Sequence, residues 1–340
     1  MIDLYSDVMT KPTPAMRKCM AEAEVGDEQM AEDPTVNRLQ DRVAELLGKE
    51  AAVYLPSGTM CNEISFAVWA HTGDEMILHR ESHARHFEGG GPASLARLTL
   101  YPVDGPRGLF TAEQVEEAIR PDHPLYPRSR IVEIENTHNK GGGSVWPLAQ
   151  LQAVCATAHR HGLITHMDGA RLLNAVTASG VSASTYAAPF HSVWIDLTKG
   201  LGCPVGAVLA GSREFIKDAR RLKQMYGGAM RQAGIIAAAG VYALEHHVAR
   251  LAEDHAHAQL LAQALAELKA VRLDPATVET NIVIFDVVAA GRTGAEIAEQ
   301  LRREGVRVSV FGSTRLRAVT HLDVSRQDIE RAITILRRIL

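Results

Sequence analysis

Apolar and polar positions along the chain fall into two alternating patterns. Nearly continuous apolar runs have the length of buried strands, and they lie at 51–55, 76–78, 98–100, 131–134, 163–167, 193–197 and 205–210. Longer segments with apolar residues at helical spacing separate several of these runs, at 34–47, 59–70, 111–119, 148–161 and 212–224. This alternation predicts a mostly parallel sheet covered by helices, and therefore an α/β fold.

The pattern changes after about residue 250. The region beyond it has a helix that opens with a capping box and three strand patterns, at 281–287, 307–311 and 315–322. We therefore expect a large domain over residues 1–249, which begins with an extended arm over 1–12, and a smaller α/β domain over 250–340.

Two polar side chains follow predicted buried strands of the large domain. Asp168 ends the run at 163–167, and Lys199 follows the run at 193–197 on a loop that contains Gly200 and Gly202. Ligands of parallel sheets bind beyond the carboxyl ends of the strands. A lysine amine that forms a Schiff base and a carboxylate that keeps a pyridine nitrogen protonated are what a pyridoxal phosphate enzyme needs. Either residue alone is more commonly a turn cap or a surface lysine.

A third candidate feature is the turn between the strand at 51–55 and the helix at 59–70. Ser57, Gly58 and Thr59 make up this turn. A helix N-terminus offers free N–H groups and a positive dipole end, which suit a phosphate group. Serine and threonine also start many helices as simple caps.

Composition narrows the classes of partner. The 340 residues include 36 basic and 40 acidic side chains, a formal charge of −4, without a long block of one sign. We therefore expect no nucleic-acid or membrane partner. The cysteines are too far apart for a zinc or dithiol motif, so we expect no metal. The weakly polar run at 233–244 is too short to span a bilayer, and the N-terminus lacks a signal-peptide pattern, so we expect a cytoplasmic protein.

With these features in place, the chain resembles the threonine aldolases, within the aspartate-aminotransferase-like (fold-type I) pyridoxal phosphate enzymes. The resemblance runs nearly end to end and rests on eight motifs in order. They are Asp3-Leu4-Tyr5-Ser6-Asp7, Gly26-Asp27-Glu28 with Glu32-Asp33-Pro34, Pro56-Ser57-Gly58-Thr59-Met60, Glu135-Asn136-Thr137-His138-Asn139, Asp168-Gly169-Ala170-Arg171, Lys199-Gly200-Leu201-Gly202, Gly228-Ala229-Met230-Arg231-Gln232-Ala233-Gly234 and Arg317-Ala318-Val319-Thr320-His321-Leu322-Asp323-Val324.

The resemblance implies a pyridoxal 5'-phosphate cofactor and its contacts. Lys199 would carry it as an internal aldimine, Asp168 would pair with the pyridine nitrogen, and His83 would stack over the ring. The phosphate would lie on the turn formed by Ser57, Gly58 and Thr59. Arg231 matches a basic residue that a neighbouring subunit contributes, so the resemblance also implies a homodimer or homotetramer with shared active sites.

The resemblance further implies the reaction and its substrate contacts. The enzyme would cleave threonine, allo-threonine or a related β-hydroxy-α-amino acid reversibly to glycine and an aldehyde. Ser6 and Arg317 match the positions that bind the α-carboxylate, and Arg171 would lie near both the ring oxygen and that carboxylate. Arg315 shares a strand face with Arg317, and only the match to the family pattern selects Arg317. His83 is the candidate acid or base, because an imidazole titrates near neutral pH.

Several positions depart from the family pattern. Met30 stands where a tyrosine is common, and Arg85 and Phe87 stand where aromatic residues are usual. Leu125 occupies the position of a histidine that addresses the substrate hydroxyl, for which His123 is a candidate substitute. We hypothesise that these changes, and Arg85 in particular, move the preference from threonine toward a bulkier or anionic β-hydroxy-amino acid. Two alternatives stay open: a β-eliminating lyase or racemase on the same scaffold, and a non-catalytic protein that keeps the fold.

Overall fold

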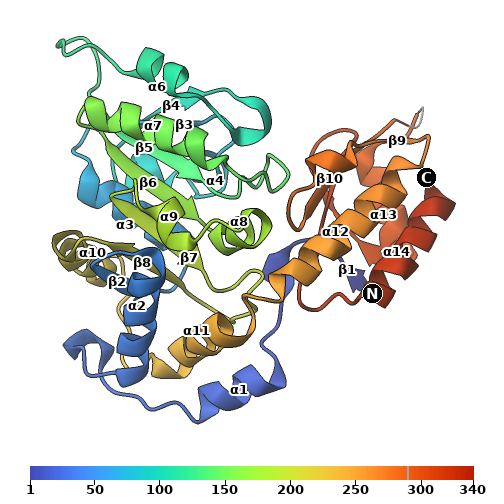
Figure 1. The fold of residues 1–340 in the computed structure, drawn as a ribbon, viewed down its shortest axis with the longest axis horizontal. Helices are drawn as coiled ribbons and strands as arrows, with labels where there is room; N and C mark the ends of the chain where they lie inside the picture. Colours follow the sequence, from blue (N-terminus) through green and yellow to red (C-terminus); the bar gives the residue numbers. More distant parts are fainter. Residues whose placement is uncertain (289–290) are drawn as a thin grey trace.

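The computed structural model describes residues 1–288 and 291–340, and these form a large and a small domain (Figure 1). The large domain is built on a seven-stranded sheet in the order β2-β8-β7-β6-β5-β3-β4. Its strands are β2 (Ala51–Leu55), β3 (Glu75–His79), β4 (Thr99–Val103), β5 (Ser129–Glu135), β6 (Ile164–Gly169), β7 (Ser192–Asp196) and β8 (Ala207–Gly211). Neighbours from β4 to β7 pair in parallel, whereas β8 is antiparallel to both β7 and β2. The predicted mostly parallel sheet is confirmed.

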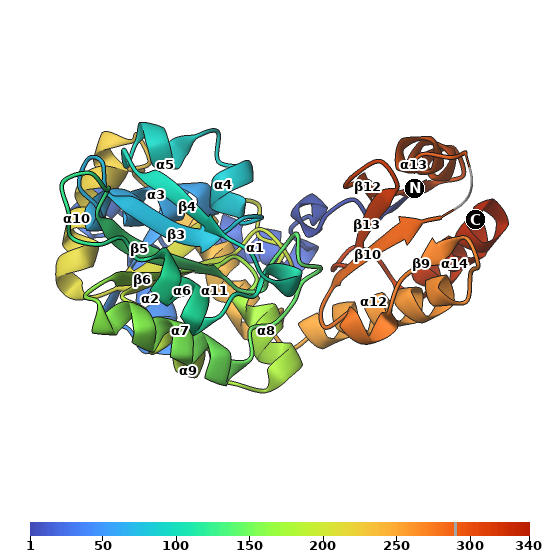
Figure 2. The ribbon, with the colours of Figure 1, turned by 90° about the horizontal axis from the view of Figure 1, so that it is seen from above.

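Helices cover both faces of this sheet, with α3 and α5 on one side and α7 and α9 on the other (Figure 2). The helices of this domain are α1 (Pro14–Ala21), α2 (Pro34–Leu47), α3 (Gly58–Trp69), α4 (His83–His86), α5 (Gly91–Ser94), α6 (Ala112–Ala118), α7 (Leu148–Arg160), α8 (Leu172–Ser179), α9 (Ala183–Ala187), α10 (Arg213–Met225) and α11 (Gly234–His246). Helix α2 illustrates how capping residues in the sequence set the two ends of a helix. The Asp33 side chain accepts the amides of Thr35 and Val36, and Gly48 ends the helix at φ 62°.

The small domain has a four-stranded antiparallel sheet in the order β12-β13-β10-β9. Its elements are α12 (Leu251–Ala266), β9 (Val271–Arg272), β10 (Ile282–Val287), α13 (Gly294–Arg303), β11 (Val306–Arg307), β12 (Ser309–Val310), β13 (Arg315–Val319) and α14 (Arg326–Ile339). The single strand predicted over 307–311 is thus divided between β11 and β12, and the strand predicted over 315–322 ends at Val319.

The N-terminal arm differs from the prediction that it belongs to the large domain. Its strand β1 (Ile2–Asp3) pairs in parallel with β11, and Ile2 and Leu4 pack in the apolar core of the small domain. Farther along the arm, the Thr10 hydroxyl donates to backbone oxygens beside Lys199 in the large domain. The arm therefore ties the two domains together, and both chain termini lie on the small domain (Figure 1).

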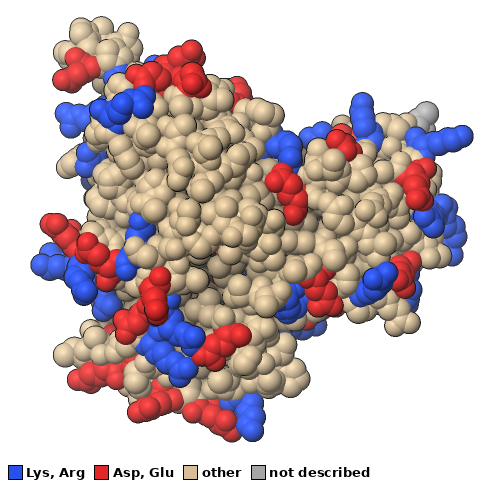
Figure 3. All heavy atoms as spheres, in the orientation of Figure 1, with Lys and Arg blue, Asp and Glu red and all other residues tan. Residues whose placement is uncertain are grey.

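Charged side chains are mixed in sign over the face shown in Figure 3, and lysine and arginine do not gather into one patch there. Within the described ranges, none of the helices combines the length and the apolar character needed to cross a bilayer.

Candidate active site

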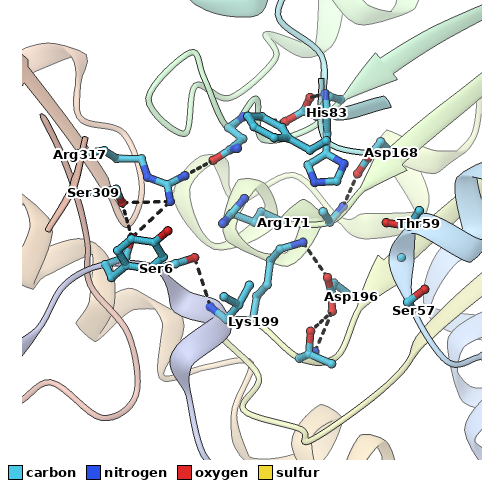
Figure 4. Close-up of a pocket in the computed structure, with 18 of the residues that line it drawn as sticks. Ser6, Ser57, Thr59, His83, Asp168, Arg171, Asp196, Lys199, Ser309 and Arg317 are labelled. Atoms are coloured by element: carbon cyan, nitrogen blue, oxygen red, sulfur yellow. Dashed lines mark hydrogen bonds and ion pairs between the residues drawn. The ribbon is translucent and has the colours of Figure 1, made fainter. Parts of the chain in front are cut away.

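A cavity of about 560 Å³ lies at the carboxyl ends of the central strands and receives residues from both domains and the arm (Figure 4). The sequence-predicted residues that line it are Ser6, Ser57, Gly58, Thr59, His83, Asp168, Arg171, Lys199 and Arg317. The structure thus brings together side chains from six separate stretches of the chain. We call this space the site cavity.

Lys199 extends into the site cavity from the loop that follows β7. Its Nζ lies 2.6 Å from Oδ2 of Asp196, and the other oxygen of Asp196 accepts both the amide and the hydroxyl of Thr198 at 2.8 Å. The hydroxyl of Thr10 fixes the same loop from the arm, because it donates to the backbone oxygen of Lys199 at 2.9 Å. The predicted loop geometry is present, with Gly202 at φ 73°, a conformation that favours glycine.

Asp168 is buried near the end of β6, with both carboxylate oxygens hydrogen-bonded. Oδ2 accepts from Asn62 at 2.9 Å, and Oδ1 accepts the amide of Ala170 at 3.0 Å. Burial and then the charge of Glu135 raise the pKa of Asp168 to about 6, against the opposing effect of His83 and Lys199. The carboxylate therefore suits a cationic or N–H donor group placed in the cavity.

His83 begins the short helix α4, and a nitrogen of its ring lies within 4.8 Å of a carboxylate oxygen of Asp168. Its amide donates to Glu135 at 2.8 Å, and its Nδ1 lies 2.8 Å from Oε1 of Glu88. Burial alone would lower the pKa of His83, but the hydrogen bond with Glu88 and the negative charges of Asp168, Glu88 and Glu135 raise it on balance. The ring is thus oriented through Nδ1.

The N-terminus of α3 opens onto the cavity beside Asp168. The Ser57 hydroxyl accepts the amide of Met60 at 3.2 Å, a normal N-cap. Within the described ranges, the amides of Gly58 and Thr59 have no acceptor, so they are available to an anion. A Cβ on Gly58 would lie 2.2 Å from the ring of Trp194. Packing against Trp194 therefore requires the glycine, independently of any phosphate.

The two arginines of the cavity have different surroundings. Nε and Nη2 of Arg171 donate to the carboxylate of Asp7 at 2.7 and 2.6 Å, and both side chains are buried. Arg317 instead donates to the neutral oxygen of Asn139 at 2.6 Å and has a buried Nε without a partner. Its guanidinium also lies 4.4 Å over the ring of Phe311. No carboxylate of the described residues forms an ion pair with Arg317, so its charge is free for an anionic ligand.

Ser6 lies on the arm beside Asp7. Its hydroxyl donates to Oδ1 of Asp7 at 3.4 Å and accepts the amide of Val8 at the same distance. Both contacts are long, so this hydroxyl can turn toward a ligand in the cavity.

Three residues predicted for the site do not line the cavity of their own chain. Arg85 is exposed and donates to the backbone oxygen of Arg80 at 2.8 Å, and His123 lies on the exposed loop before β5. Arg231 is exposed and pairs with Asp27 at 2.7 Å. Phe87, one of the departures from the family pattern, does line the cavity.

Sequence reasoning missed several residues that hold the site together. Asp7 and Asp196 could have been found from the sequence, because each is an acidic residue within or near one of the motifs quoted above. No sequence pattern pointed to Glu88, Asn62 or Phe311. Only the tertiary fold places them beside His83, Asp168 and Arg317, respectively. The ligand atoms of His83, Glu88 and Asp168 lie within 4.8 Å of one another, a spacing that a metal ion could also use.

Comparison with known proteins gives this geometry a family. The β-eliminating lyase family model matches residues 3–288. This chain belongs to the β-eliminating lyase family. The lyase is 41% identical to the low specificity L-threonine aldolase of Escherichia coli K12, over 97% of this chain and 96% of that protein.

Solved structures show the same fold at low sequence identity. The Leishmania major threonine aldolase has a TM-score of 0.84 at 18% identity and covers the whole of both chains. A Thermus thermophilus aspartate aminotransferase double mutant has a TM-score of 0.76 at 16% identity, over 100% of this chain and 92% of that one. The lyase therefore has the aspartate-aminotransferase-like fold expected from the sequence, and its family and fold imply pyridoxal phosphate.

The groups around the site cavity fit that cofactor. Lys199 offers an amine for an aldehyde, buried Asp168 offers a carboxylate for a ring nitrogen, and the Gly58 and Thr59 amides are available to a phosphate. These three kinds of group come from three different strand ends and surround one cavity.

Proposed function

We propose that this lyase is a pyridoxal phosphate-dependent aldolase that cleaves L-threonine, L-allo-threonine or related β-hydroxy-α-amino acids to glycine and an aldehyde. One observation carries the proposal: an amine, a buried carboxylate, an anion-ready helix terminus and an unpaired arginine line the same cavity. The 41% identity to a low specificity L-threonine aldolase supports the choice of reaction.

The large domain would hold the cofactor. Lys199 would bind its aldehyde, Asp168 would face its ring nitrogen, His83 would cover its ring, and the turn at 57–59 would hold its phosphate. When bound, the cofactor supplies an electron sink for the electron pair of the broken Cα–Cβ bond. The Asp196 carboxylate beside the Lys199 amine provides a place for a proton when that amine is released.

Arg317 and Ser6 would hold the α-carboxylate of the substrate. Arg317 has the unpaired charge for this task, and its contacts with Asn139 and Phe311 fix the plane of the guanidinium. Two nitrogens of Arg171 are already occupied by the bidentate bond to Asp7, so Arg171 would contribute mainly by holding Asp7 and the arm in place. A fixed carboxylate determines which bond at Cα is aligned for cleavage.

His83 would accept the proton of the β-hydroxyl, directly or through a water molecule. Its Nδ1 is engaged by Glu88, so Nε2 is the atom left for the substrate. The neutral imidazole is the base, and the pKa of His83 is raised, so activity should increase as pH rises through that pKa. A kcat/KM profile that does not rise from pH 6 to 8 would contradict this role.

The mouth of the site cavity favours a large apolar β-substituent. Tyr5, Val8, Phe87 and Val310 are exposed and line the cavity. Arg85 points to Arg80 instead, so the single chain gives no support for an anionic preference. Comparing kcat/KM for threonine, phenylserine and 3-hydroxyaspartate tests this, with phenylserine expected to be cleaved best; a clear preference for threonine would count against it.

We also propose a homodimer or homotetramer with shared sites, in the cytoplasm. Arg231 and His123 lie away from the cavity of their own chain, so any role in catalysis needs a second copy. The four free cysteines suit a reducing compartment. Light scattering of the purified protein measures the assembly.

The decisive experiment reduces the purified protein with borohydride and maps the modified lysine. We expect the protein to show cofactor absorbance and the reduced cofactor to be attached covalently to Lys199. The products of turnover should be glycine and an aldehyde. Lys199→Ala should lose both the covalent attachment and turnover. Pyruvate with ammonia would instead indicate β-elimination, a racemised product would indicate a racemase, and a protein without cofactor absorbance would indicate a non-catalytic relative.

A further inference from the structure

Behind the cavity, one amide side chain contacts both the carboxylate of Asp168 and the carboxylate that binds the His83 ring. Asn62 is fully buried on α3, and its Nδ2 donates to Oδ2 of Asp168 at 2.9 Å and to Oε1 of Glu88 at 2.7 Å. The same Oε1 of Glu88 lies 2.8 Å from Nδ1 of His83. Asn62 therefore connects the two residues that would lie against the cofactor, although it does not line the cavity itself.

The orientation of this amide is fixed by donors on its other side. Trp194 Nε1, which can only donate, lies 2.6 Å from Oδ1 of Asn62. Nε2 of His166 lies 3.0 Å from the same oxygen. A flipped amide would place its NH₂ against the indole N–H and its oxygen against two carboxylates. Nδ2 must therefore face Asp168 and Glu88.

The protonation of His166 follows from the same chain of bonds. Asn62 Oδ1 can only accept, so Nε2 of His166 carries the proton, and Nδ1 accepts from the hydroxyl of Ser192 at 2.8 Å. That hydroxyl oxygen accepts from Nε1 of Trp69 at 3.0 Å, which leaves its hydrogen for His166. Burial lowers the pKa of His166 to about 3, in agreement with a neutral ring. Two indole donors thus set the direction of every bond up to Asn62.

We propose that Asn62 is a positioning residue: its locked amide holds Asp168 and Glu88 as acceptors, and through Glu88 it holds the His83 ring. This inference rests on the proposed function, since it assigns to Asp168 and His83 the cofactor contacts given above. It extends that function to a buried residue that touches neither cofactor nor substrate.

The need for such a donor comes from the crowding of acids around Asp168. The charged or titratable groups that interact with it are Glu88, Glu135, Glu133, His83, Lys199 and Cys61. Burial and then the charge of Glu88 raise the pKa of Glu63 to about 9, so this neighbouring acid is uncharged at pH 7. Asn62 adds donors without adding charge. Its loss would favour protonation of Asp168, because hydrogen bonds to the charged form stabilise it.

Asn62→Leu tests the proposal in cofactor-free protein carrying ¹³C at the aspartate γ-carboxyl. The Asp168 signal is assigned by its disappearance in Asp168→Asn. We expect its titration midpoint to rise by about one pH unit in Asn62→Leu. Because the pKa of Asp168 is about 6 in the wild-type protein, the Kd for pyridoxal phosphate should weaken about twofold at pH 7 and about tenfold near pH 5. The loss should vanish above pH 8, where the carboxylate is ionised in both proteins. A general packing defect would not recover with pH.

The matched control is Asn174→Leu, which makes the same change at another buried asparagine, whose Nδ2 lies 3.1 Å from Nε2 of His255 and which has no hydrogen bond to Asp168, Glu88 or His83. It should leave the Asp168 midpoint unchanged. A midpoint and a Kd that stay at wild-type values in folded Asn62→Leu would overturn the proposal.

A measurement on the wild-type protein covers the case in which Asn62→Leu does not fold. The Asn62 amide protons should resonate downfield and shift with the same midpoint as the Asp168 carboxyl. Amide protons at free-amide positions, without pH dependence, would overturn the proposal. Neither experiment requires turnover. A wild-type protein that makes no glycine would thus refute the proposed function alone, whereas an unchanged Asp168 titration in Asn62→Leu would refute the inference alone.

Discussion

The buried ion pair between Asp7 and Arg171 should be the strongest single interaction that holds the arm to the two domains. Asp7 on the arm receives two hydrogen bonds from Arg171 of the large domain, at 2.7 and 2.6 Å, and one from Asn281 of the small domain at 3.1 Å. Asp7 is fully buried and Arg171 is 5% exposed. Asp7→Asn would keep the shape of the side chain but leave the guanidinium buried without a counter-charge.

The expected cost follows from that burial. Removing one partner of a buried ion pair costs about 3–5 kcal/mol, whereas a surface pair contributes about 1 kcal/mol or less. The matched control is Asp286→Asn, because Asp286 accepts a bidentate bond from Arg315 at 2.9 and 3.0 Å on the surface of the small domain. Equilibrium unfolding in urea at pH 7 should therefore separate the two variants by about 2–5 kcal/mol.

The pH dependence gives a second test of the same pair. Burial opposes ionisation of Asp7, but the charge and hydrogen bonds of Arg171, with smaller effects of Lys199 and Asn281, hold its pKa far below the ordinary value. A group with a lowered folded pKa stabilises the fold above its unfolded pKa, about 3.9 for aspartate. The gap between wild type and Asp7→Asn should thus be complete at pH 6–7 and begin to close below about pH 4. A gap smaller than about 1 kcal/mol at pH 7 would refute the reasoning.

Three further predictions concern the cavity. In steady-state kinetics, Arg317→Ala should raise KM for the amino acid much more than it lowers kcat. The value of kcat/KM should fall about 10–100-fold, which corresponds to the loss of a charge-assisted hydrogen bond. The control Arg315→Ala should stay within about twofold of wild type, and equal losses in the two variants would argue against the assignment. Burial and Glu135 raise the pKa of Asp168 to about 6, so the carboxylate loses its charge as pH falls through 6. When the Kd for pyridoxal phosphate is measured from pH 5 to 8, the Kd of the wild-type protein should rise more steeply on acidification than that of Asp168→Asn. Parallel curves for the two proteins would contradict this. Gly58→Ala should destabilise the fold by about 1–3 kcal/mol, because the new Cβ would meet the Trp194 ring at 2.2 Å; an unchanged melting temperature would show that the ring moves aside freely.

The two arginines of strand β13 show where sequence reasoning about the site reached its limit. Arg315 and Arg317 alternate correctly for one face of a strand, so the pattern alone could not choose between them. In the fold, Arg317 lies buried at the cavity, whereas Arg315 lies at the strand end, exposed and paired with Asp286. Burial, and not the strand face, distinguishes them.

The sequence by itself determined the alternation of strands and helices, the strand ends that carry Asp168 and Lys199, and the helix start at Ser57. These follow from periods of 2 and 3.6 residues and from local turn chemistry, which short stretches of chain encode directly. Only the tertiary structure decided that Asp7 takes Arg171, that Asn62 holds Asp168, and that the arm packs with the small domain. Those contacts join residues 164 and 106 positions apart in the first two cases. They depend on sheet order and domain packing, which no local pattern records.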